Sequence, residues 1–220
     1  MNEPENESVL TPKTKCIVVG GSPTLINAGY GTLIDSYETV VRVNMCHTHG
    51  TMRSITRKDL GTKTSIWCTS VNKRKQPNTS DYFLPETLED NQVWFRMKQG
   101  RDDYTQLIEN KFGKINASVL RNHTGHTSKI DTELRHVYGN NYIVTGVLAI
   151  LNCIRLYGDV TILGHTLYLE SNKSTTYPGK VTDEKLSDNC KPLIPILKRL
   201  HQEGKLVFIN NDEKTLLFNS

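Results

Sequence analysis

A Gly-Gly-Ser-Pro turn directly after a short apolar run is the first candidate for chemistry in this sequence. Residues 16–19 read Cys-Ile-Val-Val, which is typical of a strand buried on both faces of a parallel sheet. Gly20 and Gly21 let the backbone turn sharply and approach a group above the strand's carboxyl end, where open α/β sheets bind ligands. With Ser22 they are candidate ligand contacts. The alternative is a tight strand-to-helix turn in which glycine supplies a positive φ, and the turn alone leaves both interpretations open.

A second candidate is the Thr145-Gly146 pair, which stands at the start of an apolar helical pattern. A hydroxyl and bare amides at a helix N-terminus suit a phosphate or a carboxylate, because that end carries partial positive charge and unpaired N–H groups. The alternative is that Thr145 only caps the helix. Apolar residues further along this helix are expected to cover the sheet: Leu148, Leu151, Ile154 and Leu156.

Strand and helix patterns alternate along the chain and must position these candidates. Short apolar or β-branched runs predict strands at residues 16–19, 39–43, 65–68, 92–96, 117–120, 160–163 and 206–209. Helical patterns predict helices at residues 24–28, 102–111, 129–138 and 192–203, besides the helix that starts at Thr145. Repeated strand, helix, strand order predicts a Rossmann-like α/β fold with a doubly wound, mostly parallel sheet.

Length and composition fit one compact domain. The chain has 220 residues and a formal net charge of +4 at pH 7, and a domain of this length buries a full sheet between helices. We expect residues 1–14 to form a flexible tail and residues 15–220 to form a single domain. The charge is too small and too dispersed to indicate nucleic acid as a partner. The sequence shows no long apolar span and no internal repeat.

Two segments together resemble the signature motifs of the sialyltransferases. Residues 15–64 resemble the family's long motif, and residues 142–164 resemble its short motif, in which a turn leads to an apolar helix, a cysteine and a strand ending in glycine. The positions that match the long motif are Cys16, Gly20, Ser22, Leu25, Ile34, Asp35, Arg42, Asn44, Gly61 and Thr64. The resemblance implies a variant of the glycosyltransferase type A fold and a site for a CMP-sugar donor. The donor contacts that it implies are Gly20, Gly21, Ser22, Asn44, Thr145 and Gly146.

The resemblance also implies the reaction. An acceptor hydroxyl attacks the anomeric carbon of the donor sugar, a base removes its proton, and CMP leaves with negative charge that the protein must stabilise. Our candidates for this stabilisation are Tyr168 and Tyr177, which follow the strand ending at Gly164, where relatives carry two tyrosines that donate to the departing phosphate. A phenol donates without being charged. The alternatives are that Tyr168 packs under its loop and that Tyr177 lies at the surface.

The base is where the resemblance breaks. The family places a histidine shortly before its last helix, whereas residues 186–192 contain none here. Asp188 in this stretch is one candidate base, because carboxylates serve as the base in many glycosyltransferases. His165, directly after a predicted strand, is the second, although an imidazole hydrogen-bonded at a strand end is the alternative. His201 lies within the last predicted helix and is expected to be exposed.

No metal ion or cofactor is expected. His123 and His126 have the spacing of metal ligands or acceptor contacts, but two histidines without a third ligand are a weak pattern. The sequence also lacks an Asp-x-Asp of the kind that ties a divalent cation to a nucleotide diphosphate. The CMP-sugar is the donor substrate, and the partners that we expect are this donor and a glycan acceptor.

Two cysteines are informative about the cellular compartment in which the protein works. Cys16 and Cys153 fall at the two positions that form a disulfide between the long and short motifs in animal members of the family. Residues 1–15 are polar and charged, so they are neither a secretory signal nor a membrane anchor. We therefore expect a cytoplasmic protein with both thiols reduced, and a Golgi-like location only if an N-terminal anchor was removed.

These observations lead to three functional hypotheses. The first is a sialyltransferase-like glycosyltransferase that moves sialic acid, or a related acid sugar, from a CMP-sugar to a glycan hydroxyl. The second is a CMP- or CDP-binding relative that has lost catalysis, which the missing histidine suggests. The third is a non-catalytic scaffold in which the motifs only pack the sheet.

Overall fold

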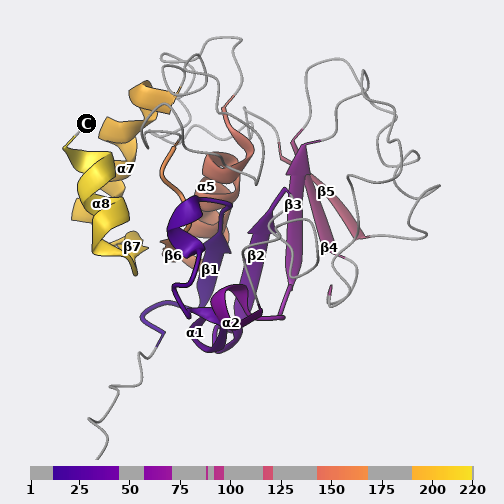
Figure 1. The fold of residues 1–220 in the computed structure, drawn as a ribbon. Helices are drawn as coiled ribbons and strands as arrows, with labels where there is room; N and C mark the ends of the chain where they lie inside the picture. Colours follow the sequence, from indigo (N-terminus) through magenta and orange to yellow (C-terminus); the bar gives the residue numbers. More distant parts are fainter. Residues whose placement is uncertain are drawn as a thin grey trace, which may run out of the picture.

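The structure of the protein is a computed structural model, which describes residues 12–44, 57–70, 88, 92–96, 116–120, 143–167 and 190–219. These residues contain a seven-stranded sheet in the order β5-β4-β3-β2-β1-β6-β7 (Figure 1). Every neighbouring pair of strands is parallel. The strands are β1 (Cys16–Val19), β2 (Thr39–Val43), β3 (Ile66–Ser70), β4 (Gln92–Arg96), β5 (Asn116–Leu120), β6 (Val160–Leu163) and β7 (Leu206–Phe208).

This strand order confirms the predicted doubly wound α/β fold. The chain builds the sheet from β1 to β5 in one direction and then adds β6 and β7 on the other side of β1. The order therefore reverses between β1 and β6, and doubly wound sheets bind ligands outside the carboxyl ends of the strands at such a point. All seven predicted strands are present, with ends within two residues of their predicted positions.

The helices were harder to predict than the strands. The helical segments are η1 (Pro23–Leu25), α1 (Gly31–Asp35), α2 (Arg57–Leu60), α5 (Thr145–Tyr157), η3 (Lys191–Leu193), α7 (Ile194–Gln202) and α8 (Asn211–Phe218). The helix predicted at residues 24–28 is only the 3₁₀ turn η1, and α1, α2 and α8 were missed because such short helices barely repeat a 3.6-residue period. The helices predicted at residues 102–111 and 129–138 lie outside the described residues. No described helix is long and apolar enough to cross a membrane.

The sheet separates two apolar clusters. Val18 packs with residues of α5 and α7 on one face, and Ile17 packs with residues of η1, α1 and α2 on the other, because successive strand side chains point to opposite faces. Full burial of one such side chain contributes about 1.5–3 kcal/mol. Leu148 is buried as expected, whereas Leu156 is 50% exposed. Its predicted packing against the sheet is wrong, because the last three residues of α5 are all exposed.

Helix α5 runs antiparallel to the strands. Near its C-terminus, Cys153 meets Cys16, the first residue of β1, with the two Sγ atoms 3.5 Å apart. Near its N-terminus, a Cβ added to Gly146 would lie 3.9 Å from Cγ1 of Val43, the last residue of β2. The N-terminus of α5 therefore lies at the carboxyl edge of the sheet.

Two charged residues of the long motif hold the segment that leads into β3. The Asp35 carboxylate accepts hydrogen bonds from the backbone N–H groups of Thr62 and Lys63, at 2.8–2.9 Å. The buried Arg42 guanidinium donates to the carbonyl oxygens of Leu60 and Lys63, at 2.7 and 2.9 Å. Both side chains therefore stabilise the approach to β3.

The C-terminal elements α7, β7 and α8 pack together (Figure 1). His201 Nδ1 lies 2.8 Å from the carbonyl oxygen of Leu206, and its ring lies 5.4 and 5.6 Å from the rings of Phe208 and Phe218. The expectation that His201 is exposed is wrong, because β7 and α8 cover that side of α7 and leave the residue half-buried.

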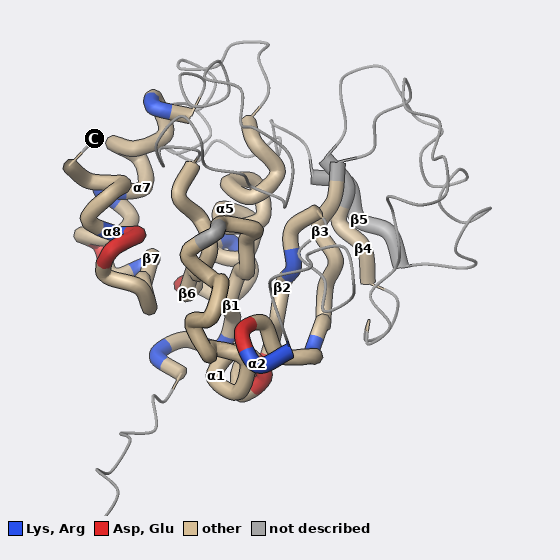
Figure 2. The backbone as a smooth tube through the Cα atoms, in the orientation of Figure 1, with Lys and Arg blue, Asp and Glu red and all other residues tan. Residues whose placement is uncertain are grey.

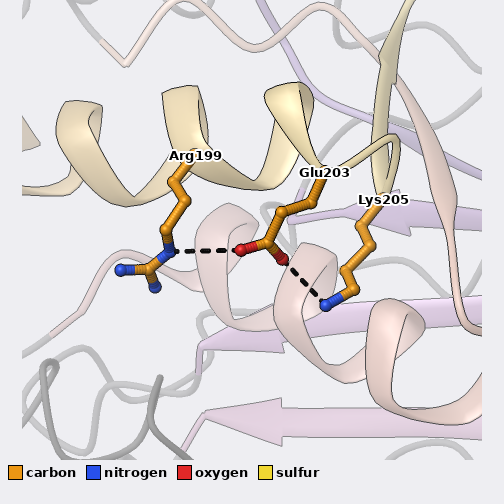
Figure 3. A network of polar contacts seen from close by, with 3 residues as sticks. All are labelled: Arg199, Glu203 and Lys205. Atoms are coloured by element: carbon orange, nitrogen blue, oxygen red, sulfur yellow. Dashed lines mark hydrogen bonds and ion pairs between the residues drawn. The ribbon is translucent and has the colours of Figure 1, made fainter.

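A small ion-pair network lies at the C-terminal end of α7. Glu203 lies between Arg199 and Lys205, with N···O distances of 3.6 and 2.8 Å (Figure 3). All three side chains are about one third exposed or more, so each pair contributes on the order of 0–1 kcal/mol. The network is therefore a suitable place for a surface control variant.

Replacing Asp35 by Ala removes the acceptor for the N–H groups of Thr62 and Lys63. We expect the free energy of unfolding to fall by about 3 kcal/mol, because each hydrogen bond to a charged group contributes about 1.5–3 kcal/mol. Urea denaturation measures the change. The matched control is Glu38→Ala, which removes an exposed carboxylate 3.9 Å from Lys15 Nζ and should change stability by less than about 0.5 kcal/mol. Equal losses in both variants would contradict the structural role of Asp35.

Candidate functional site

The carboxyl ends of β1 and β6 are joined by a close contact between the turns that follow them. Gly20 N donates to the carbonyl oxygen of Leu163 at 2.8 Å, and Ser22 N donates to that of Gly164 at 3.1 Å. A Cβ added to Gly20 would lie only 2.2 Å from the Gly164 carbonyl oxygen, so no larger residue fits there without displacement.

This contact corrects the explanation of the glycine turn. Neither Gly20 nor Gly21 has a positive φ, so the interpretation based on a positive φ is wrong. The close approach predicted for Gly20 does occur, but its immediate neighbours are Gly164 and His165 of the same chain. The predicted ligand contacts of Gly20, Gly21 and Ser22 stay predictions.

The imidazole of His165 lies between the two signature motifs. Its Cε1 would be 2.9 Å from a Cβ added to Gly20 and also 2.9 Å from one added to Gly146. His165 is 7% exposed, and burial lowers its pKa from 6.5 to about 4, against the opposing effect of a hydrogen bond with the Val18 backbone. The ring is therefore neutral at pH 7. Its buried Nε2 has no hydrogen-bond partner among the residues that the structure describes.

These surroundings bear on the predicted role of His165 as a base. A group with a pKa of about 4 accepts a proton weakly at neutral pH, and Nε2 is shielded from solvent. The environment favours the alternative interpretation, an imidazole held at a strand end. Its role as a base stays a prediction.

The N-terminus of α5 lacks a side-chain cap from its N-cap residue. The N-cap residue is Val144, in an extended conformation and without a side-chain cap hydrogen bond. Thr145 is the first helical residue rather than the cap, so the alternative in which it caps the helix is wrong. Thr145 is buried and Gly146 is half-buried. Unpaired N–H groups of a first turn, together with the helix dipole, suit a negatively charged group.

Asn44 lies at the same edge of the sheet, directly after β2. Its φ of 54° is left-handed, a conformation that asparagine tolerates better than most residues. Its backbone N–H donates to the carbonyl oxygen of Cys68 at 2.7 Å, and its carbonyl oxygen accepts from Trp67 Nε1 at 2.6 Å. The backbone of Asn44 is therefore fixed independently of its side chain.

The remaining predicted residues divide into two groups. Tyr168, Tyr177 and Asp188 lie outside the described residues and stay predictions, as do the contacts of His123 and His126. Among the described residues, no group of three or more potential metal-ligating side chains could hold an ion.

Cys16 and Cys153 are free, buried thiols. Burial, followed by the hydrogen bond with Cys16, raises the pKa of Cys153 well above its ordinary value. The disulfide that the resemblance implies is not formed in this structure, although the two Sγ atoms lie only 3.5 Å apart. Because Cys16 begins β1, the pair lies at the opposite end of the strands from the site.

Glu213 is a residue of the site region that sequence reasoning missed. It is fully buried on α8, and its carboxylate accepts from Gly164 N at 2.9 and 3.0 Å. The sequence carried one signal: Asn210 followed three residues later by an acidic residue marks a helix N-terminus. That signal would have located α8 but not the contact with Gly164, which is distant along the chain.

A parallel sheet with a close glycine turn, and a helix N-terminus without a side-chain cap at the same edge, place the chain among the doubly wound α/β proteins. The chain belongs to glycosyltransferase family 29 (sialyltransferase), whose sequence pattern matches residues 2–204. The known donor substrate of this family is CMP-sialic acid. Family and fold together support glycosyltransferase activity of the sialic acid transfer type.

Solved structures share the fold. A crystal structure of a mammalian sialyltransferase superposes with a TM-score of 0.55 at 18% sequence identity, over 89% of this chain and 68% of that chain. A mammalian sialyltransferase in complex with Gal-beta-1-3GalNAc-ortho-nitrophenol gives a TM-score of 0.50 at 19% identity, over 88% of this chain and 68% of that chain. Comparison with curated protein sequences finds no significant match.

The buried imidazole predicts a specific pH dependence of stability. The unfolded chain protonates His165 near pH 6.5 and the folded chain only near pH 4, so the unfolded state binds more protons between these values. The contribution of a neutral His165 to the free energy of unfolding is present in full above pH 6.5. As the pH falls toward 4, this contribution decreases by up to about 3 kcal/mol.

Urea denaturation of wild type and His165→Gln at pH 7 and pH 5 isolates this contribution, because the carboxylates common to both proteins cancel in the comparison. We expect the variant to lose less stability than wild type between the two pH values. An identical loss in both proteins would contradict the burial of a neutral imidazole.

Proposed function

We propose that this protein transfers sialic acid, or a related acid sugar, from a CMP-activated donor to a hydroxyl group of a glycan acceptor. The observation that carries the proposal is the uncapped first turn of α5, which starts at Thr145 beside the carboxyl ends of β1, β2 and β6. Charged groups of the donor gain from the dipole and N–H groups of that turn, by about 0.3–2 kcal/mol.

In this proposal the donor binds between the ends of β1 and β2 on one side and the N-terminus of α5 on the other. Gly21, Ser22 and Asn44 border the cytidine monophosphate from the side of β1 and β2, and Thr145 and Gly146 border it from α5. Polar groups fixed by the fold before the substrate arrives stabilise developing charge more effectively than mobile water does. The backbone hydrogen bonds of Asn44 to the Cys68 carbonyl and from the Trp67 indole supply this rigidity.

We assign the chemistry to residues that follow β6 in the sequence. We propose that Tyr168 and Tyr177 donate to the departing phosphate and that Asp188, rather than His165, removes the acceptor proton, because burial makes the imidazole a weak base. Neutral hydroxyls and a helix end suffice for a leaving nucleoside monophosphate, so the proposal includes no metal ion or cofactor.

Incubation with CMP-sialic acid and lactose-type acceptors tests the reaction. We expect CMP release that accelerates with acceptor concentration, and a loss of kcat of about 10²–10⁴ in Asp188→Asn, as is typical when a general base is removed. Binding of CMP without turnover of any CMP-sugar would favour the second candidate, a relative that has lost catalysis, which is motivated by the missing histidine in residues 186–192. Absence of binding to any cytidine nucleotide would contradict both.

Two substitutions at Asn44 separate its side chain from its backbone. Both Asn44→Gly and Asn44→Ala remove the amide, and we expect both to weaken CMP binding by roughly tenfold, or about 1.4 kcal/mol. Only alanine is strained at a φ of 54°, so only Asn44→Ala should lower the melting temperature clearly. Calorimetric titration and thermal unfolding measure the two effects. Unchanged CMP affinity in Asn44→Gly would remove this side chain from the donor site.

A further inference from the structure

A buried carboxylate bridges the turns that follow β1 and β6. Glu213 accepts from Gly164 N with both oxygens, at 2.9 and 3.0 Å, and His165 N lies 3.5 Å from Oε2. From the other side, the hydroxyl of Thr24 in η1 donates to Oε1 at 2.5 Å. One side chain therefore connects the end of β6 to the segment that follows the glycine turn.

Helix α8 presents Glu213 in a fixed position. The side chain of Asn210 caps the helix by accepting from Asp212 N at 2.8 Å and from Glu213 N at 3.4 Å. The acidic first turn of α8 (red in Figure 2) also suits the positive end of the helix dipole. These residues follow the part of the chain that matches the family pattern, which ends at residue 204.

Because Glu213 is a buried carboxylate, its contacts require more precise geometry than an apolar contact does. A buried carboxylate is strongly unfavourable unless hydrogen bonds offset its lost hydration, and such bonds are short and directional. Nearby, burial and then the charges of Glu213 and Asp212 raise the pKa of Tyr30. The phenol of Tyr30 therefore stays protonated and adds no negative charge.

The turn held by Glu213 includes His165, whose imidazole lies between the long and short motifs. Gly164 has a φ of +74°, and a Cβ there would lie 2.7 Å from Leu25 Cδ1, so its backbone has little room to move. His165 follows directly, with its ring against Gly20 and Gly146. A displacement of Gly164 therefore moves this ring relative to the first turn of α5.

We propose that Glu213 is a positioning residue of the donor site: through Gly164 it fixes His165 against the N-terminus of α5 and so sets the shape of the nucleotide pocket. The identity of the ligand rests on the proposed function. In this proposal Glu213 acts through the backbone N–H of Gly164 and takes no part in proton transfer.

Glu213→Gln tests this role. The amide group replaces one acceptor oxygen by a donor that cannot accept from Gly164 N, so the turn loses its two-oxygen contact. We expect the dissociation constant for CMP and the KM for CMP-sialic acid to rise roughly tenfold or more, whereas the KM for the acceptor stays unchanged. A merely structural role would not produce this selectivity for the donor.

Two control variants calibrate the result. Asp35→Asn removes a half-buried negative charge far from the carboxyl edge and lowers stability, yet it should leave CMP affinity unchanged. Glu203→Gln removes an exposed carboxylate (Figure 3) and should change neither quantity. If Glu213→Gln weakens CMP binding no more than Asp35→Asn does, the proposal is overturned. If it tightens CMP binding, Glu213 competes with the ligand for the Gly164 amide, and the proposal is equally overturned.

The NMR signals of the His165 imidazole provide a readout that does not need a ligand. We expect them to move in Glu213→Gln and not in Asp35→Asn. If Glu213→Gln does not fold, Glu213→Asp replaces it, since it keeps the charge but withdraws the oxygens from Gly164 N. If wild type fails to bind CMP, the proposed function fails and these signals decide alone: movement supports the positioning of His165 by Glu213, and unchanged signals refute it.

Discussion

The close approach of the β1 turn to the end of β6 is the constraint on which the carboxyl edge of this protein depends. Gly20 has no room for a Cβ beside the carbonyl of Gly164, and its N–H is bonded to Leu163. The neighbouring strands β1 and β6 therefore end together, and His165 has to fit between Gly20 and the start of α5. Helix α5, the imidazole and the buried carboxylate of Glu213 all lie around this one contact.

The long motif serves the scaffold as well as the site. Asp35 and Arg42 bind backbone groups of residues 60–63, and the side chain of neither residue bonds to the Gly20 turn in the contacts described. The backbone of Asn44 is held by β3 through Cys68 and Trp67, and its side chain is the part that we propose to contact the nucleotide. Residues of one sequence signature thus do different physical work, and the signature alone does not distinguish them.

The sequence was sufficient to predict the sheet because each strand is a short apolar run between glycines or polar residues, and this pattern is local. It was insufficient for α1, α2 and α8, which are too short to show a helical period. The close approach at Gly20 was predicted, but its partner Gly164 was not. Gly164 lies far along the chain, and no residue near Gly20 indicates it. Glu213 and His201 were misjudged or missed for the same reason: their environments are assembled by segments that meet only in the folded protein.

The contact between Cys16 and Cys153 spans 137 residues of chain, and it has a consequence for how the molecule is made. Strand β1 obtains the helical cover of its α5 face, and its second neighbour β6, only after most of the polypeptide has been synthesised, so contacts of high sequence separation dominate the route to the native state. Until then one apolar face and one edge of β1 remain uncovered in the nascent chain. Chaperones protect intermediates of this kind from aggregation.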